Sequence, residues 1–289
     1  MPNLKEIKTR IKSVKNIEQI TKAMQMVAAA KVRKVQEKVT SFRPFSERIE
    51  EVFKNLSTKI KNEDIKEPLL EQREIKTIGV VIITSDKGLC GSYNSNLLRF
   101  ANNEIKNLES LGYKVKIWLV GNKSFGAFKY THLEIVNKYS QLPQIPTFNE
   151  ARMLKNDLIE KFLNKNIDKV LFIYTKFVSM MSFRPSILEL LPINKEEKET
   201  KSMSEYIFEP DPQTLISKIL PEYIENQIYR ALLESSASEL ASRMTAMSAA
   251  SKNAKEMIGA LTLAYNKARQ AAITKEILEV VGGAEALEK

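Results

Sequence analysis

The residues of this chain best suited to chemistry lie in the turn Ser85-Asp86-Lys87-Gly88-Leu89-Cys90-Gly91-Ser92, directly after a strongly apolar run. A glycine-rich turn between a strand and a helix can bind phosphate through its backbone N–H groups. This turn matches neither G-x-G-x-x-G nor G-x-x-x-x-G-K-[ST], so we predict no nucleotide site here. We interpret Gly88 and Gly91 as turn residues and Cys90 as a small, partly buried filler.

The other nucleophiles, acids and bases show no catalytic spacing either. Cys90 is the only cysteine and His132 the only histidine, so no internal disulfide or cysteine-based metal site can form. Glu196 and Glu197 are neighbours, but they lie in a charged run where nothing separates their pKa values into acid and base roles. We therefore expect no catalytic residue, no metal site and no cofactor, and the lone cysteine favours a reducing compartment.

The segment that carries the turn alternates between strands and helices. This order predicts a Rossmann-like α/β domain over residues 75–193, with a mostly parallel sheet and helices on its faces. Pro185 and Pro192 should place the last strand at an edge of the sheet. The expected strands are Thr77–Thr84, Tyr113–Val120, Glu134–Tyr139, Lys169–Val178 and Ser182–Ile193, and the expected helices are Asn94–Leu111 and Asn149–Leu163.

The two ends of the chain carry almost no helix-breaking residues. Gly and Pro are absent from Asn3 to Arg43, and Gly259 is the only one between Glu222 and Val281. Such stretches predict two long helices, over residues 1–61 with a kink near Pro44 and over residues 213–289. Residues 194–212 then form a polar loop and the segment that leads into the second helix.

Apolar residues in both ends recur at steps of three and four, which is typical of a coiled-coil seam. We expect the two helices to pair antiparallel. The predicted seam is Leu4, Ile7, Ile11, Val14, Ile17, Ile20, Met24, Val27, Val32, Val35, Val39 and Phe42 on the first helix, and Ile224, Ile228, Leu232, Met244, Met247, Ile258, Leu261 and Tyr265 on the second.

Composition leaves several readings of the helical ends open. Residues 1–48 hold 12 Lys/Arg against 4 Asp/Glu, which fits a solvated face, an acidic partner or nucleic acid. The Ala/Ser-rich run 235–251 fits tight packing within the chain or a bearing surface. The sequence contains neither an apolar run of about 18 residues nor an apolar secretion signal, so we expect neither a membrane span nor secretion.

Several motifs resemble the γ subunit of F-type rotary ATP synthases, and the resemblance covers essentially the whole chain. The run Ile20–Lys31 (ITKAMQMVAAAK) and the tail Tyr265–Ala284 match that family, the tail through I-T-x-E, an acid three residues later, and G-A. The turn Ser85–Gly91 and the segment Tyr206–Asp211 match as well. The implied fold is a long antiparallel coiled coil of the terminal helices plus the central α/β domain.

The resemblance implies a central rotor shaft without catalytic residues of its own. Such a subunit couples rotation of a membrane c ring to conformational changes at the catalytic β subunits, and regulates ATPase activity and proton flow. The implied partners are the α and β subunits of the hexameric head, the ε subunit and the c ring. The implied location is peripheral, at the cytoplasmic face of a bacterial plasma membrane, with no nucleic acid and no bound nucleotide.

The resemblance also assigns contact residues, each with a structural alternative. Met24 is alternatively an ordinary seam residue, Thr274 and Glu276 alternatively cap or pack their own helix, and the aromatic residues alternatively pack a loop. The implied contacts are Lys22, Met24, Arg243, Arg269, Gln270, Thr274 and Glu276 with β, Arg43, Phe45, Tyr206, Phe208 and Glu209 with the c ring, and Gly88, Cys90 and Gly91 with ε.

Two other functions compete with this reading. A nucleic-acid-binding coiled coil would use the basic first helix, with affinity that falls steeply with salt. A Rossmann-like enzyme with a helical oligomerisation arm would need a nucleotide site, which the turn at 85–92 does not provide.

Overall fold

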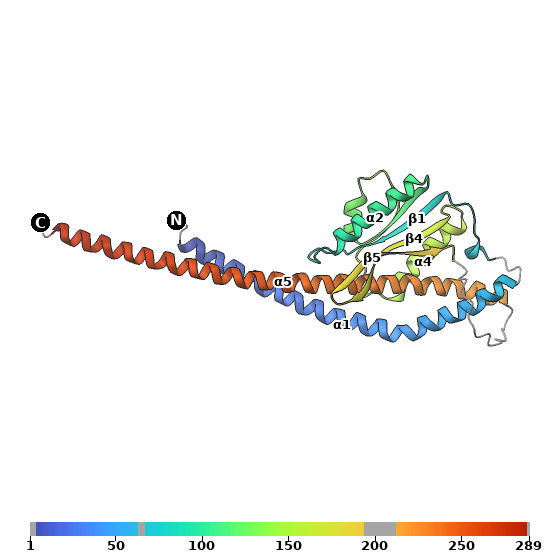
Figure 1. Ribbon diagram of the computed structural model, residues 1–289, viewed down its shortest axis with the longest axis horizontal. Helices are drawn as coiled ribbons and strands as arrows, with labels where there is room; N and C mark the ends of the chain where they lie inside the picture. The colour runs from blue at the N-terminus through green and yellow to red at the C-terminus, as the bar shows by residue number, and fades with distance from the viewer. Residues whose placement is uncertain (1–3, 63–66, 194–211, 288–289) are drawn as a thin grey trace. The chain divides into compact units, whose positions relative to one another are not determined.

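The computed structural model describes residues 4–62, 67–193 and 212–287. It has two long terminal helices and, between them in the chain, a five-stranded sheet with shorter helices (Figure 1). The elements are α1 (Leu4–Asn62), the 3-10 helix η1 (Pro68–Leu70), β1 (Thr77–Ile83), α2 (Tyr93–Ser110), β2 (Lys114–Val120), α3 (Asn122–Phe128), β3 (Glu134–Tyr139), α4 (Phe148–Leu163), β4 (Lys169–Ser179), β5 (Ser182–Leu191) and α5 (Pro212–Leu287).

The chain divides into two compact units. We call Met1–Ala28 with Arg243–Lys289 the helix-pair unit, and Ala29–Ser242 the α/β unit. Both terminal helices contribute to both units, since α1 runs through Ala28 and α5 through Ser242. The sheet therefore shares its unit with the inner halves of α1 and α5, whereas the sequence alone had suggested a separate domain over residues 75–193.

The sheet confirms the expected α/β architecture. Its strand order is β3-β2-β1-β4-β5, with parallel pairing throughout except for the antiparallel pair of β4 and β5. β5 is an edge strand as predicted, and Pro185 lies opposite Thr175. The central strand β1 is buried along Ile78–Ile83, because helices cover both faces of a mostly parallel sheet.

Side chains of the sheet alternate between two apolar layers. On one face, Ile78, Val80 and Ile82 pack with residues of α2 such as Leu97. On the other face, residues of β1, β2 and β4 pack with α4, with the inner half of α5 and with part of α1. The helices α2 and α4 thus cover opposite faces of the sheet (Figure 1).

Within the α/β unit, α1 and α5 pair antiparallel. The rings of Phe42 and Tyr229 lie 4.9 Å apart and those of Phe53 and Tyr223 lie 4.5 Å apart, so rising numbers in α1 meet falling numbers in α5. Pro44 lies inside α1 without ending it. Figure 1 shows α1 bending in this part, as expected when proline removes one helical hydrogen bond.

The helix-pair unit is held together by a regular seam. Ile7, Val14 and Ala28 of α1 are buried, as are Met247 and Ala254 of α5. The buried positions of α1 are spaced by multiples of seven residues, the repeat of a left-handed coiled coil.

Part of the predicted seam is wrong. Ile17, Ile20 and Val27 are 52, 59 and 54% exposed, while Glu18 and Thr21 are only partly exposed. The α1 sequence carries two apolar stripes, and spacing alone does not reveal which one faces α5. The stripe that contains Ile7 and Val14 forms the seam, and the other stripe stays uncovered within this chain.

The first part of the Ala/Ser-rich run favours tight packing. Ala237 and Ala241 are 1% and 0% exposed and belong to the apolar layer between sheet and helices. Small side chains allow α5 to approach the sheet closely here. Among the described residues, no helix is both long and apolar enough to cross a membrane.

Candidate functional site

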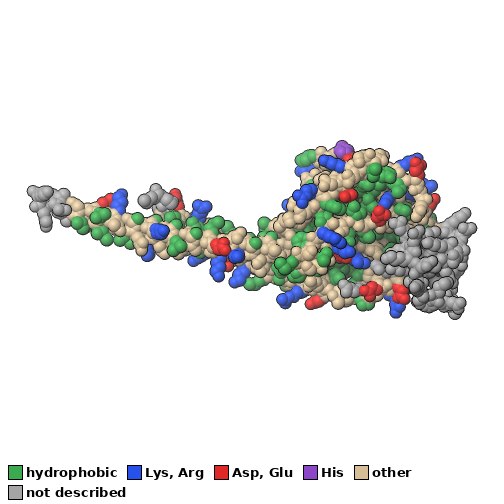
Figure 2. All heavy atoms as spheres, viewed as in Figure 1, with side chains coloured by type: hydrophobic (Ala, Val, Ile, Leu, Met, Phe, Trp, Pro, Cys, Tyr) green, Lys and Arg blue, Asp and Glu red, His purple; other side chains and the backbone are tan. Residues whose placement is uncertain are grey.

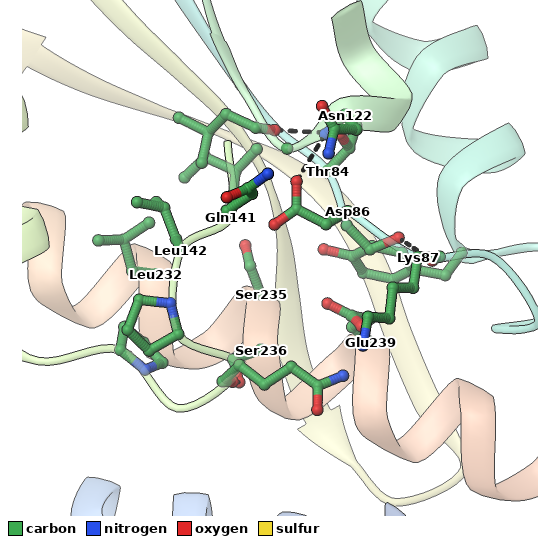
Figure 3. A pocket seen from close by; sticks show the side chains of 18 of the residues that line it. Thr84, Asp86, Lys87, Asn122, Gln141, Leu142, Leu232, Ser235, Ser236 and Glu239 are labelled. Carbon is green, nitrogen blue, oxygen red and sulfur yellow. Dashed lines mark hydrogen bonds between the residues drawn. The ribbon is translucent and has the colours of Figure 1, made fainter. Parts of the chain in front are cut away.

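A cavity of about 620 Å³ lies at the carboxyl edge of the sheet (Figure 3). The ends of β1 and β2, the loop after β3 and the helix α5 line it. Ligands of open α/β sheets bind at the carboxyl ends of the strands, so this is where a catalytic site would be expected. Asp86, Asn122, Gln141 and Ser235 are among its polar residues.

Several polar groups at this edge hold the local turns together. A carboxylate oxygen of Asp86 accepts a hydrogen bond from the backbone N of Asn122 at 2.9 Å. The Thr84 hydroxyl accepts from the backbone N of Ser124 at 2.8 Å and donates to the Val120 carbonyl at 3.0 Å. These bonds fix the end of β1 against the start of α3, and none of them requires a ligand.

Gly121 permits this close approach of the two strand ends. Its φ is +88°, and a Cβ added there would lie 2.4 Å from the carbonyl oxygen of Thr84. Both the left-handed backbone and the contact exclude any side chain. Glycine is thus required at this position for packing.

The turn after β1 packs inward against α5. The Cys90 side chain is buried, and the amide nitrogen of Asn94 lies 3.0 Å from its sulfur. The Cys90 carbonyl accepts a 2.6 Å hydrogen bond from the Ser242 hydroxyl. Gly91 is exposed and Gly88 partly so, whereas the thiol of Cys90 points into the protein.

The other candidate for chemistry is a surface residue. The side chain of His132 is 77% exposed, and its Nε2 lies 2.7 Å from a carboxylate oxygen of Glu109. Within residues 4–62, 67–193 and 212–287, no group of three or more His, Cys, Asp or Glu side chains is arranged to hold a metal ion.

Sequence reasoning missed a buried ionic group in the α/β unit. The Glu225 side chain of α5 is 2% exposed and accepts from Lys155 Nζ of α4 at 2.5 Å, while Arg152 Nη2 lies 3.2 Å from its other oxygen. Burial alone would raise the pKa of Glu225, but the bonds and charges of Lys155 and Arg152 hold it below its ordinary value. One signal in the sequence could have found this group: Glu225 is a charged residue next to Ile224 and near Ile228, two apolar residues that are buried.

The residues expected to meet β subunits lie on α1 and α5. Five of them are exposed: Lys22, Arg269, Gln270, Thr274 and Glu276. Met24 is partly buried, and Arg243 is 6% exposed. The Thr274 hydroxyl donates to the Gln270 carbonyl at 2.9 Å within the helix.

Only one residue of the expected c-ring surface can be placed in full. Phe45 is 51% exposed, and its ring lies 5.5 Å from that of Phe42. Tyr206, Phe208 and Glu209 lie outside the described residues, as does the side chain of Arg43.

The helix-pair unit exposes large apolar side chains along both helices. Ile17, Ile20 and Val27 of α1 are more than half exposed, and the end of α5 continues this pattern. Figure 2 shows hydrophobic and basic side chains side by side along this unit. Exposed apolar surface of this kind marks a site for a protein partner. The α5 members and their exposed fractions are Ile273 48%, Ile277 57%, Leu278 66%, Val280 72% and Val281 57%.

Relatives named ATP synthase gamma chain match nearly the whole chain. A family model described as ATP synthase matches residues 3–287. The ATP synthase gamma chain of Gloeothece citriformis is 46% identical over 314 residues, which cover 99% of this chain and 100% of the relative. The gamma chain of a Nostoc species is 45% identical with the same coverage.

Solved structures agree with these relatives. The central stalk and c-ring structure of the Tetrahymena thermophila mitochondrial ATP synthase contains a chain 31% identical, with a TM-score of 0.61, covering 80% of this chain and 99% of that one. A chain in the Euglena gracilis OSCP/F1/c-ring structure has a TM-score of 0.68 at 20% identity, covering 98% of this chain and 94% of that one, and supports the fold. This chain belongs to the family of ATP synthase γ chains.

Proposed function

We propose that this chain is the central rotor shaft of a proton-driven F-type ATP synthase. The observation that carries the proposal is the apolar surface that the helix-pair unit leaves uncovered, from Ile17 to Val27 and from Ile273 to Val281. A helix pair with such a surface needs a surrounding partner to keep these side chains from water. Relatives named ATP synthase gamma chain, and the Tetrahymena thermophila chain from a structure titled central stalk and c-ring, support the identification of that partner as the ATP synthase head.

The shaft acts by unequal contact and supplies no reacting group. As the c ring turns the shaft, the helix pair presents a different face to each β subunit in turn, and ATP forms at the β subunits. Moving one β subunit from 1:99 to 99:1 between two conformations requires about 5.5 kcal/mol of differential interaction. Summed contacts along a paired helix can provide this, and the same contacts regulate ATP hydrolysis and proton flow.

The β contacts are proposed along both helices. Met24 offers a flexible, polarisable side chain to a sliding surface, and Lys22 beside it offers a charge to acidic groups. Arg269 is exposed and can donate two parallel hydrogen bonds to a carboxylate, so lysine would not replace it. Gln270, Thr274, Glu276 and the small exposed part of Arg243 complete this proposed surface.

The remaining contacts are proposed at the α/β unit and the loop before α5. Phe45 is exposed and would join Arg43 and residues 206–209 on the c ring, at the cytoplasmic face of a bacterial plasma membrane. The ε subunit would meet the turn at Gly88 and Gly91. Because Cys90 is buried beneath that turn, it would position the turn without touching ε.

A charge on the uncovered α1 stripe tests the proposal. Ile20→Asp should leave the isolated chain folded, because Ile20 is 59% exposed, yet it should impair assembly with α and β subunits. Gln19→Asp is the matched control, since residue 19 is exposed but lies about 100° around the helix. ATP synthesis by vesicles that contain the complete complex is the readout. Equal synthesis by both variants would contradict a buried apolar contact at this stripe.

A further inference from the structure

The contact between α5 and the rest of the α/β unit is mainly apolar. Ile224, Ile228 and Ala241 of α5 belong to the same buried layer as the sheet and α4. Apolar burial holds surfaces together, but it is non-directional, so it specifies the position of a helix along its axis less sharply than hydrogen bonds and ion pairs do. A helix that must transmit force therefore needs directional contacts as well.

The buried ionic group supplies such contacts within this interface, between the buried Ile224 and Ile228 of α5. Arg152 and Lys155 are three residues apart on α4, so they present two cations on one helix face. Both reach the Glu225 carboxylate, with Lys155 Nζ at 2.5 Å from one oxygen and Arg152 Nη2 at 3.2 Å from the other. The buried Lys155–Glu225 pair, with the 56% exposed Arg152 at the other carboxylate oxygen, favours one register of α5 against α4.

Serine side chains of α5 extend these directional contacts toward its later turns. The Ser236 hydroxyl donates to the Gln144 carbonyl in the loop before α4. The Ser238 hydroxyl lies 2.8 Å from the Glu234 carbonyl of its own helix and 3.3 Å from the Thr175 carbonyl of β4. Ser242 donates to the Cys90 carbonyl at 2.6 Å. From Glu225 to Ser242, these anchors extend over roughly 25 Å of helix at 1.5 Å per residue.

We propose that Glu225 is a positioning residue that fixes the register of α5 against the α/β unit, so that torque passes between them without slip. The proposal rests on the rotor function proposed above and names the residues that join the shaft helix to its domain. It does not require Glu225 to contact any other subunit.

The energetics favour register over stability as the role of this group. Desolvation of buried charges offsets most of their attraction, so apolar residues of similar size often replace a buried ion pair without loss of stability. Fixing one register is the best-attested use of buried polar groups. Register and stability can therefore be separated by substitution.

Two variants and one control make that separation in the complete complex. Glu225→Gln removes the charge and leaves Lys155 with a neutral partner. The double variant K155M/E225L replaces the pair with apolar side chains of similar size. Glu189→Gln is the control, because Glu189 forms a more exposed ion pair with Lys169 at 2.9 Å in the same unit.

The readout is the number of protons pumped per ATP hydrolysed by purified complexes in vesicles, measured with the thermal midpoint of the isolated chain. We expect Glu225→Gln to lower the pumping ratio by about two- to tenfold while hydrolysis continues. The double variant should retain the thermal midpoint of the natural chain and still show the lowered ratio. Glu189→Gln should change neither quantity.

Each outcome decides between register and stability. If K155M/E225L pumps as many protons per ATP as the unsubstituted complex, the proposal is overturned. If Glu225→Gln does not assemble, the result for the double variant decides by itself. Failure of the unsubstituted complex to pump at all would instead refute the rotor function on which the proposal rests.

Discussion

The same helix, α5, meets two different environments in the two units. In the α/β unit its small side chains are closed in by the chain itself, with Ser238 and Ala241 both 0% exposed. In the helix-pair unit its large apolar side chains stay uncovered, and Val280 is 72% exposed. Exposure along one helix thus follows what covers it: its apolar residues are buried where its own domain packs against them and uncovered where a partner is needed.

The ionic interactions differ in the same way. Glu225 of the α/β unit is buried and pairs with the buried Lys155 and the half-exposed Arg152, whereas the Lys275–Glu279 pair of the helix-pair unit is 78% and 64% exposed. Exposed pairs of this kind contribute little, because water and salt screen them. The α/β unit therefore has directional contacts of its own, while the helix-pair unit depends on its seam and on its partners.

The largest effect should come from breaking that seam. Replacing Ile7, Val14 and Met247 together with Asp places three unpaired charges in buried positions, at about 3–5 kcal/mol each. We expect the two helices to separate, seen as fast amide hydrogen exchange over residues 4–28, and ATP synthesis in reconstituted vesicles to stop. Unaltered synthesis would refute the paired helix as the element that carries torque.

The matched control uses the uncovered stripe. Asp at Ile17 and Ile20 should leave amide protection of the isolated chain unchanged, since both side chains are more than half exposed. Equal loss of protection in both sets of variants would mean that the two stripes are not distinct.

The next effect tests close packing within the α/β unit. Gly121→Ala should destabilise this unit by about 3 kcal/mol or more, because its Cβ would lie 2.4 Å from the Thr84 carbonyl oxygen at a φ of +88°. Gly112→Ala shares the left-handed backbone, with a φ of +86°, but its Cβ meets no atom within 4 Å. Gly112→Ala should lower the free energy of unfolding, measured by chemical denaturation, by only about 1 kcal/mol. If the two substitutions lower the free energy of unfolding by similar amounts, backbone strain and not the Cβ contact with Thr84 dominates the loss.

A smaller and pH-dependent effect is expected where the chain enters β1. Asp168 accepts from the backbone N of Lys76 and Thr77 at 3.0 and 2.9 Å and from Arg73 Nε at 2.8 Å. Partial burial would raise the pKa of Asp168, but these bonds hold it below its ordinary value. Asp168→Asn should cost about 2 kcal/mol at neutral pH.

The sign of the pH dependence follows from the lowered pKa. Because the folded state favours the charged carboxylate, its stabilisation is complete above about pH 4 and is lost as the pH falls through the lower pKa of the folded state. The difference in unfolding free energy between the natural chain and Asp168→Asn should therefore shrink below about pH 4. A difference that stays constant with pH would contradict the assignment.

Local pattern predicted most of the fold. Strands such as Thr77–Ile83 and the edge position of β5 follow from apolar runs and proline placement, which act over a few residues. The helix α3 was missed because it is only seven residues long and follows β2 directly. The short η1 was missed for the same reason.

Contacts between segments that are distant in the chain could not be predicted from the sequence pattern. Ile7 and Ile20 are the same residue type, and both belong to apolar stripes of α1 with steps of three and four residues. Only the position of α5 decides which of them is buried. The Lys155–Glu225 contact joins residues 70 apart in the chain, and no local rule pairs them. The resemblance to γ subunits named Arg243 as a contact, but it could not reveal that the chain itself buries this side chain to 6% exposure.

The smallest effect on the isolated chain should come from removing residues 275–289. The deleted large apolar residues, such as Ile277 and Leu278, are more than half exposed, so the thermal midpoint of the isolated chain should not change. ATP synthesis in vesicles should fall, because the proposed contact with the head is lost, but less than after the Asp substitutions in the seam. A truncation as damaging as the seam variants would place the torque-bearing contact at the end of α5, since its seam with α1 would remain intact.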